Sequence, residues 1–213
     1  MGKKIKKKKK KKFGIKQLKA LTNNVGVKKN EINKNVAFIS FVEEQFDLSN
    51  YNHVYDLCCG KGIVGTYFSL KRNNVTAVDN SGNNKRNQLI KRLDEKFYDF
   101  INTSIYDHGH LQNDSLVLSL HACGNLTDKV IELALQSQSD FAVMSCCHGD
   151  KQYFSPREIP DVNLVDKLGR DHYADLLRLN YVSEIGYTAG IFEISEDITP
   201  KNRIIWGKKK SRE

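Results

Sequence analysis

VYDLCCGKG at residues 54–62 and VTAVD at residues 75–79 decide the fold of this chain. Both are short, mostly apolar runs rich in residues that favour strands, which predicts buried strands over 54–58 and 75–79. Residues 63–71 between them have a helical pattern, and the glycine loop 59–62 leads into it. A strand, a glycine loop, a helix and a second strand make a βαβ unit of the kind that holds a nucleoside-containing cofactor at the loop.

Two aspartates bear on which cofactor this unit binds. Gly60-Lys61-Gly62-Ile63-Val64-Gly65 satisfies the dinucleotide pattern G-x-G-x-x-G, and Asp79 lies about 20 residues on, where an acid can bind ribose hydroxyls. Asp56, four residues before Gly60, would repel a pyrophosphate. The alternative role of this carboxylate is to cap the N–H groups of the loop itself. S-adenosylmethionine instead carries a cationic ammonium and sulfonium, and its carboxylate can bind backbone N–H groups. We therefore predict S-adenosylmethionine, with an NAD-dependent oxidoreductase or an inactive cofactor site as alternatives.

The positive charge of the chain is concentrated at its start. The 213 residues carry a formal charge of +9, and nine of the 34 basic residues are lysines within residues 1–12. The other basic residues equal the 25 acidic ones in number. We predict that residues 1–12 form a disordered, solvated tail. It could bind phosphates as a salt-sensitive arm, direct nuclear import, or only increase solubility.

Composition also bears on the compartment. No apolar run approaches the length of a membrane span, and residues 1–12 lack the apolar core of a secretory signal. Five cysteines in a domain of ordinary size fit reduced thiols. We therefore expect a cytoplasmic or nuclear protein without a membrane segment. The oligomeric state stays open.

Periodicity divides the chain into four parts. Residues 1–12 are the tail, 13–50 a helical extension, 51–207 the main domain and 208–213 a basic C-terminal tail. In the extension, Asn30 is the expected N-cap of a helix that places Ile32, Val36, Ile39 and Val42 on one face. Further strands are expected over 100–103, 115–120, 141–145, 184–194 and 203–207, and helices over roughly 83–97, 125–137 and 163–180.

The order of these elements predicts the fold class. Strands alternate with helices up to residue 180, which indicates an α/β fold with a doubly wound, seven-stranded, mostly parallel sheet. The last two strands follow one another without a crossover helix, so they are expected to form an antiparallel hairpin at the sheet edge. Class I methyltransferases have this Rossmann-like arrangement. Arg178, in the last predicted helix, is expected on a solvated face, with contact to substrate phosphates as the alternative.

Cysteines and histidines gather where the predicted strands end. Because ligands of an open α/β sheet bind outside the carboxyl ends of its strands, these side chains are expected to meet in one crevice. They are Cys58, Cys59, His121, Cys123, Cys146, Cys147 and His148.

Two stretches resemble one group of class I methyltransferases. Residues 119–128, Ser-Leu-His-Ala-Cys-Gly-Asn-Leu-Thr-Asp, resemble its H-x-C-G-x-x-T-D signature after the fourth strand. Residues 145–148, Ser-Cys-Cys-His, resemble its C-C-H segment after the fifth, and 199–203 its turn before the last strand. The group includes tRNA acceptor-stem 2′-O-methyltransferases and related methyltransferase-like proteins. Two departures are Cys58 in place of the first loop glycine and the absence of zinc-binding modules before the domain.

The resemblance implies an S-adenosylmethionine-dependent methyltransferase that acts on RNA, with a tRNA ribose 2′-hydroxyl as one candidate acceptor. The lysine tail would then bind RNA phosphates. Alternatives are a small-molecule or protein substrate, a binding module without transfer, and an RNA cytosine-5 methyltransferase. In the last, one of Cys123 and Cys146 would be the nucleophile and the other would release the product. The cysteines and histidines at the strand ends are also of the types that bind zinc. Adjacent cysteines, however, are poorly placed to bind one ion, so we predict no metal.

Candidate site residues follow from these motifs. His121 is the candidate base, oriented by Asp128, because an imidazole ordinarily titrates near neutral pH. The remaining catalytic candidates are Cys123, Cys146 and His148. The expected cofactor-binding residues are Asp56, Cys58, Cys59, Gly60, Gly62, Asp79, Asn80, Ser104, Ile105 and Leu120.

Overall fold

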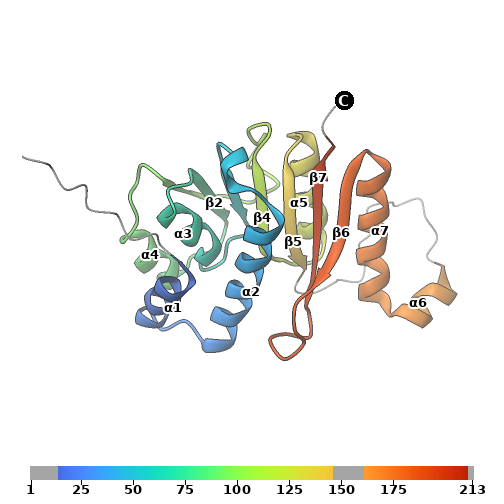
Figure 1. The fold of residues 1–213 in the computed structure, drawn as a ribbon, viewed down its shortest axis with the longest axis horizontal. Helices are drawn as coiled ribbons and strands as arrows, with labels where there is room; N and C mark the ends of the chain where they lie inside the picture. The colour runs from blue at the N-terminus through green and yellow to red at the C-terminus, as the bar shows by residue number, and fades with distance from the viewer. Residues whose placement is uncertain (1–13, 146–160, 211–213) are drawn as a thin grey trace, which may run out of the picture.

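A computed structural model describes residues 14–145 and 161–210 of the chain. Within these residues it contains a sheet of seven strands in the order β3-β2-β1-β4-β5-β7-β6 (Figure 1). The strands are β1 (Val54–Leu57), β2 (Val75–Asp79), β3 (Tyr98–Asn102), β4 (Leu116–Ala122), β5 (Asp140–Ser145), β6 (Tyr187–Glu193) and β7 (Arg203–Lys209). Strands β1 to β5 pair in parallel, whereas β7 is antiparallel to both β5 and β6. The predicted fold class, with its terminal hairpin, is therefore confirmed.

Helices cover both faces of the sheet. They are α1 (Ile15–Asn24), α2 (Lys29–Gln45), the 3-10 turn η1 (Leu48–Asn50), α3 (Ile63–Leu70), α4 (Asn84–Ile90), α5 (Asn125–Gln136), α6 (Val162–Leu168) and α7 (Arg170–Glu184). One core cluster joins side chains of α1 to α4 to one face, and a second joins α5 and α7 to the other. This two-sided burial explains why the parallel strands read as continuous apolar runs.

An irregularity in β4 changes the direction of its last side chains. Leu116, Leu118 and Leu120 belong to the first core cluster, as alternation requires, but Ala122 belongs to the second. The pairing of β4 with β5 shifts register between Ser119 and Ala122, so β4 holds one extra residue there. Such a bulge bends a strand and re-aims its side chains. It leaves Leu120 in the first core cluster and Ala122 in the second, with His121 between them at the carboxyl end of β4.

Three sequence predictions of helix ends were wrong. Helix α2 begins at Lys29 with Lys28 at its N-cap, so Asn30 is not the cap. Helix α4 ends at Ile90 rather than near residue 97. The helix predicted over 163–180 is two helices, because Gly169 adopts φ +78° between α6 and α7. A glycine takes up this left-handed conformation without the steric cost that other residues bear.

Helix α2 is tied to the glycine loop and to α3. Lys61 donates to both carboxylate oxygens of Glu31 at 2.6 Å, which joins the loop to the start of α2. Near the other end of α2, Glu43 accepts a hydrogen bond from Tyr67 at 2.9 Å and pairs with Lys71. These contacts place the first turns of α2 beside the cofactor loop.

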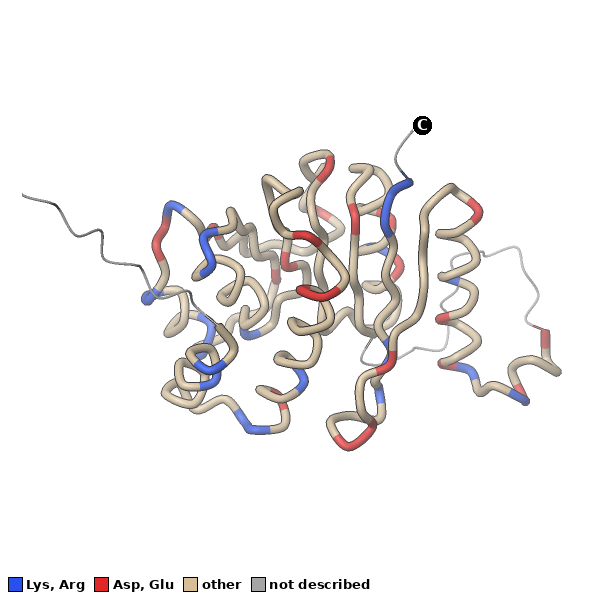
Figure 2. Tube along the Cα trace, viewed as in Figure 1, with Lys and Arg blue, Asp and Glu red and all other residues tan. Residues whose placement is uncertain are grey.

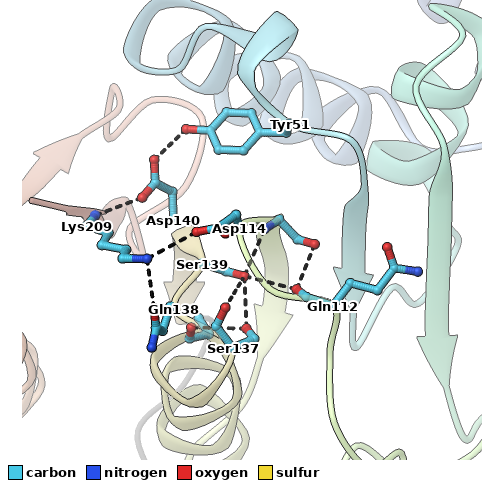
Figure 3. Close-up of polar contacts among 10 residues, drawn as sticks. Tyr51, Gln112, Asp114, Ser137, Gln138, Ser139, Asp140 and Lys209 are labelled. Carbon is cyan, nitrogen blue, oxygen red and sulfur yellow. Dashed lines mark hydrogen bonds and ion pairs between the residues drawn. The ribbon is translucent and has the colours of Figure 1, made fainter. Parts of the chain in front are cut away.

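The amino ends of β4 and β5 lie at the sheet edge opposite the glycine loop, where a polar cluster joins distant segments (Figure 3). Asp140 accepts hydrogen bonds from the Tyr51 hydroxyl at 2.5 Å and from the Lys209 backbone N–H at 2.8 Å. The Lys209 ammonium donates to Gln138 at 2.8 Å and to Asp114 at 3.1 Å. Burial, with the bond to Asp140, raises the pKa of Tyr51. This edge therefore holds η1, β5 and β7 together.

Acidic and basic residues are interspersed along the described chain (Figure 2). This distribution agrees with the balance of charge outside residues 1–12. No helix in residues 14–145 and 161–210 is long and apolar enough to cross a membrane.

Candidate active site

The loop after β1 is built from residues in the left-handed region. Cys58, Gly60 and Gly62 have φ values of +54°, +53° and +66°. Glycine adopts this conformation freely, whereas a residue with a Cβ pays about 1 kcal/mol. At Gly62 an added Cβ would also lie 3.0 Å from the Tyr98 hydroxyl. Cys58 thus occupies a position with the geometry of a glycine, in agreement with its place in the motif.

Asp79 at the end of β2 joins the two halves of the βαβ unit. Its Oδ2 accepts a hydrogen bond from the Gly60 N–H at 2.8 Å. Its Oδ1 accepts from the Ser81 N–H at 2.8 Å and from the Ser81 hydroxyl. A carboxylate has about four acceptor positions, so capacity is left for a ligand hydroxyl. Asp79 lines the pocket described below, as the prediction of ribose binding requires.

Asp56 lies beneath the loop. It is 1% exposed, and its Oδ2 accepts a hydrogen bond from the Gly65 N–H in the first turn of α3 at 2.8 Å. Burial raises its pKa to about 7, against the lowering effect of that hydrogen bond. The structure therefore uses Asp56 to cap α3, and Asp56 is not among the pocket-lining residues. Charge repulsion from Asp56 is accordingly a weaker argument against a dinucleotide than the sequence suggested.

Arg86 of α4 supports the site and was not among the predicted site residues. The side chain is 2% exposed, and its Nη1 donates to the Gly60 carbonyl at 2.7 Å. Its Nη2 donates to the Ser81 carbonyl, and the guanidinium lies 4.1 Å from the centre of the Phe100 ring. One side chain thus holds the loops after β1 and β2. The one available signal was a basic residue in the first turn of the helix that follows an acid-ended strand.

A pocket of about 260 Å³ opens at the carboxyl ends of the first four strands. Its lining residues are Cys58, Gly60, Asp79, Asn80, Ser81, Thr103, Ser104, Ile105, His121 and Leu126. Seven of these were predicted site residues, whereas Ser81, Thr103 and Leu126 were not. Of the other predicted cofactor residues, Cys59 and Leu120 are buried in the core and Gly62 forms the start of α3.

His121 lies on the wall of this pocket and of a second one. Burial lowers its pKa to about 4, and the positive charge of Lys34 contributes to the lowering. The ring is therefore neutral at physiological pH and can accept a proton or a hydrogen bond. It is a weaker base than the near-neutral imidazole expected from sequence.

Asp128 has a different partner from the one predicted. It lies in the first turn of α5, and its Oδ1 accepts a hydrogen bond from Arg178 Nε at 2.6 Å. Arg178 is 1% exposed and also pairs with Asp175 at 3.2 Å, which in turn accepts from Arg203 at 2.7 Å. Asp128 thus belongs to an ion network around the buried Arg178 and Asp175, and Arg178 is not on a solvated face.

Thr127 of the same motif has a structural contact. Its buried hydroxyl donates to the Ala122 carbonyl at 2.8 Å, just past His121. The threonine of the motif therefore fixes the end of β4.

The described cysteines are poor nucleophiles in this state. Burial raises the pKa of Cys58 to about 12 and also raises the pKa of Cys59, so both free thiols are protonated at neutral pH. Cys123 is disulfide-bonded, so the expectation of reduced thiols fails at this position, and a nucleophilic role would first require reduction. Cys146, Cys147 and His148 lie outside the described residues. Within the described part of the chain, no group of three metal-binding side chains is arranged around one point.

Comparisons with known proteins identify a methyltransferase domain in this chain. The family profile described as a methyltransferase domain matches residues 27–151. The mouse glutathione S-transferase C-terminal domain-containing protein is 32% identical over 117 residues, which are 51% of this chain and 18% of that protein. The chain therefore spans less than a fifth of this relative.

Two solved structures share the fold. The 23S rRNA methyltransferase ErmE has a TM-score of 0.52 at 11% identity, over 82% of this chain and 68% of that one. Magnesium protoporphyrin IX methyltransferase of Synechocystis PCC 6803, solved with S-adenosylmethionine, has a TM-score of 0.54 at 11% identity, over 85% and 80%. The fold is that of class I methyltransferases. The chain belongs to the methyltransferase-domain family that its residues 27–151 match.

Proposed function

We propose that the protein is an S-adenosylmethionine-dependent methyltransferase that acts on RNA, with a tRNA ribose 2′-hydroxyl as the candidate acceptor. The observation that supports methyl transfer is the position of His121. It stands at the bulged end of β4, on the common wall of two adjoining pockets. A cofactor in one pocket and an acceptor in the other would meet beside this ring.

The residues that line the first pocket support the assignment of S-adenosylmethionine to it. Asp79 has acceptor capacity for a ribose hydroxyl, and Ser81 and Ser104 line the same pocket. The cofactor, when bound, supplies an electrophilic methyl group on a sulfonium. The residues of the chain hold it in place, and positioning of this kind can supply much of a rate enhancement.

His121 would act on the proton of the acceptor. When a hydroxyl oxygen takes up a methyl group, its proton must leave, and a neutral imidazole can accept a hydrogen bond from it and then the proton. The low pKa of His121 keeps the ring in that neutral form. Asp128 is committed to Arg178 and is assigned no part in this step.

The choice of RNA rests on sequence rather than on the fold. ErmE acts on 23S rRNA, whereas the Synechocystis enzyme acts on a porphyrin, so the fold serves both substrate classes. RNA is favoured because residues 119–128 resemble the signature of a group that includes tRNA 2′-O-methyltransferases. The nine lysines of residues 1–12 also favour RNA. A cationic tail of this kind binds phosphates with an affinity that falls as salt rises.

The test is methyl transfer from labelled S-adenosylmethionine into total cell extract, followed by separate ribonuclease and protease digestion. Label released by ribonuclease from tRNA-sized material supports the proposal, and mapping then gives the methylated atom. Replacement of Lys6–Lys12 by serine should weaken binding of this RNA and reduce its salt dependence. Label in protein or in small molecules would overturn the RNA assignment. Binding of the cofactor without any transfer would favour a binding module.

A further inference from the structure

A second pocket, of about 460 Å³, adjoins the first and shares Gly60 and His121 with it. The first turns of α2 and the turn between β6 and β7 provide its other walls, including Lys34 and Thr199. Because His121 belongs to both walls, a molecule in the second pocket lies next to the place where the methyl group would be transferred.

The charges around this pocket are unevenly matched. Lys61 and Glu31 satisfy one another, because Lys61 Nζ lies 2.6 Å from each oxygen of the Glu31 carboxylate. Lys34 follows Glu31 by one helical turn and also lines the pocket. Among the described residues it makes neither a hydrogen bond nor an ion pair. The pocket lining thus contains two lysines and one glutamate. The glutamate is paired with Lys61, so the ammonium of Lys34 has no carboxylate partner among the lining residues.

The environment of Lys34 favours an anion. The side chain is partly buried, and burial lowers its pKa while the charge of Glu31 opposes that change. A cation withdrawn from water without a partner is costly, and a bound anion offsets this cost. The amide groups of Asn30 and Asn83 lie on the same walls and can donate hydrogen bonds. An ammonium group with nearby amide donors is suited to a phosphate.

We propose that this second pocket binds the methyl acceptor and that Lys34 binds a phosphate of that acceptor. The inference rests on the proposed function, because it takes the first pocket as the cofactor site. RNA carries such a phosphate next to each ribose, and phosphorylated small molecules carry one as well. Either molecule would present a phosphate to Lys34, and the experiment below distinguishes RNA from a phosphorylated small molecule.

The direct test is lysine footprinting of the full-length protein. Limited reductive methylation is measured by mass spectrometry at Lys34 and at Lys29, alone and with bulk tRNA or inorganic pyrophosphate. Lys29 is the matched control, because it is exposed on the same helix and does not line this pocket. We expect the labelling of Lys34, relative to Lys29, to fall at least about threefold with tRNA.

The two probes distinguish the sources of the phosphate. Selective protection by tRNA supports an RNA acceptor. Selective protection by pyrophosphate alone supports the phosphate site but assigns it to a phosphorylated small molecule. If neither probe protects Lys34 more than Lys29, the inference is wrong.

Variants provide the second test. Lys34→Gln should leave the affinity for S-adenosylmethionine unchanged and reduce methyl transfer about tenfold, whereas Lys29→Gln should change neither. Thr199→Trp, which fills the second pocket from the β6–β7 turn, should act like Lys34→Gln. Equal transfer by both lysine variants would overturn the inference alone. Absence of transfer by the wild-type protein would overturn the proposed function, and footprinting would still report on Lys34.

Discussion

The Asp79 carboxylate accepts a hydrogen bond from the Gly60 N–H at 2.8 Å, and this contact joins the end of β2 to the loop after β1. The same side chain faces the first pocket, where it is assigned to the ribose. Asp79→Ala would remove both contacts. Because hydrogen bonds to charged groups contribute about 1.5–3 kcal/mol, the Kd for S-adenosylmethionine should rise at least about tenfold by calorimetry. Unchanged affinity in a folded Asp79→Ala protein would remove Asp79 from the cofactor site.

Arg86 is expected to be a positioning residue. Arg86→Gln leaves the carbonyls of Gly60 and Ser81 without their buried donor, which should lower the free energy of unfolding by about 2 kcal/mol. The Kd for the cofactor should rise as well, since both loops border the pocket. Arg86→Lys should restore little, because an ammonium cannot reproduce the planar fork of guanidinium donors. Arg92→Gln, at an exposed site nearby, is the control. An effect on stability alone, with cofactor affinity intact, would show that Arg86 does not position the loops for binding.

Cys58 should behave as a residue held in the conformation of a glycine. Cys58→Gly and Cys58→Ala both remove the thiol, but only glycine relieves the left-handed strain at φ +54°. The glycine variant should therefore be the more stable by about 1 kcal/mol in urea unfolding. Methyl transfer should survive in both, because a thiol with a pKa of about 12 is no nucleophile at neutral pH. Loss of transfer in both variants would mean that the sulfur takes part in the reaction.

Asp56 should give the unfolding free energy a pH dependence. Its pKa is about 7 in the folded protein, above the ordinary value of 3.8. Between these values the folded state keeps a proton that the unfolded state has released, so the contribution of Asp56 to stability falls as pH rises from about 4 to about 7. Asp56→Asn does not titrate and can still accept from the Gly65 N–H.

The measurement for Asp56 is the difference in unfolding free energy between Asp56→Asn and the wild type at several pH values. This difference cancels the opposite trend from His121, whose lowered pKa makes the folded state more stable as pH rises from about 4 to about 6.5. The difference should move in favour of the asparagine variant toward pH 7. A difference that stays constant with pH would contradict the raised pKa of Asp56.

Replacement of His121 should affect methyl transfer but not cofactor binding. His121→Ala should keep the affinity for S-adenosylmethionine within about twofold, because other residues supply the ribose contacts. The transfer rate should fall by about 100-fold or more, the usual contribution of a general base. The wild-type rate should also show no inflection near pH 6.5, since the pKa of His121 is about 4. If both binding and transfer survive, His121 is not the base.

The order of the strands and the glycine loop could be predicted because they depend on local patterns. Apolar runs and the absence of a crossover helix before β7 determine the sheet and its hairpin. The position of His121 depends on a bulge between β4 and β5, which is a property of two paired strands and leaves no mark in either one alone. The motif identified the residue, but the bulge beside it could not be predicted from the sequence.

Ion-pair partners were the least predictable part of the site. Asp128 and Arg178 lie 50 positions apart in sequence, so proximity along the chain pointed instead to His121 as the partner of Asp128. Asp56 lies in the first strand, as predicted, yet its carboxylate accepts a hydrogen bond from the backbone N–H of Gly65. A buried charge takes the partner that the fold brings closest, and sequence patterns do not contain that information.

Calorimetric titration of the full-length protein shows whether the loop after β1 binds S-adenosylmethionine. The protein should bind S-adenosylmethionine at one site per chain and give no binding heat with NAD. Asp79→Ala should weaken the first titration. Binding of NAD, with no binding of S-adenosylmethionine, would contradict the assignment of the cofactor and favour an NAD-dependent oxidoreductase.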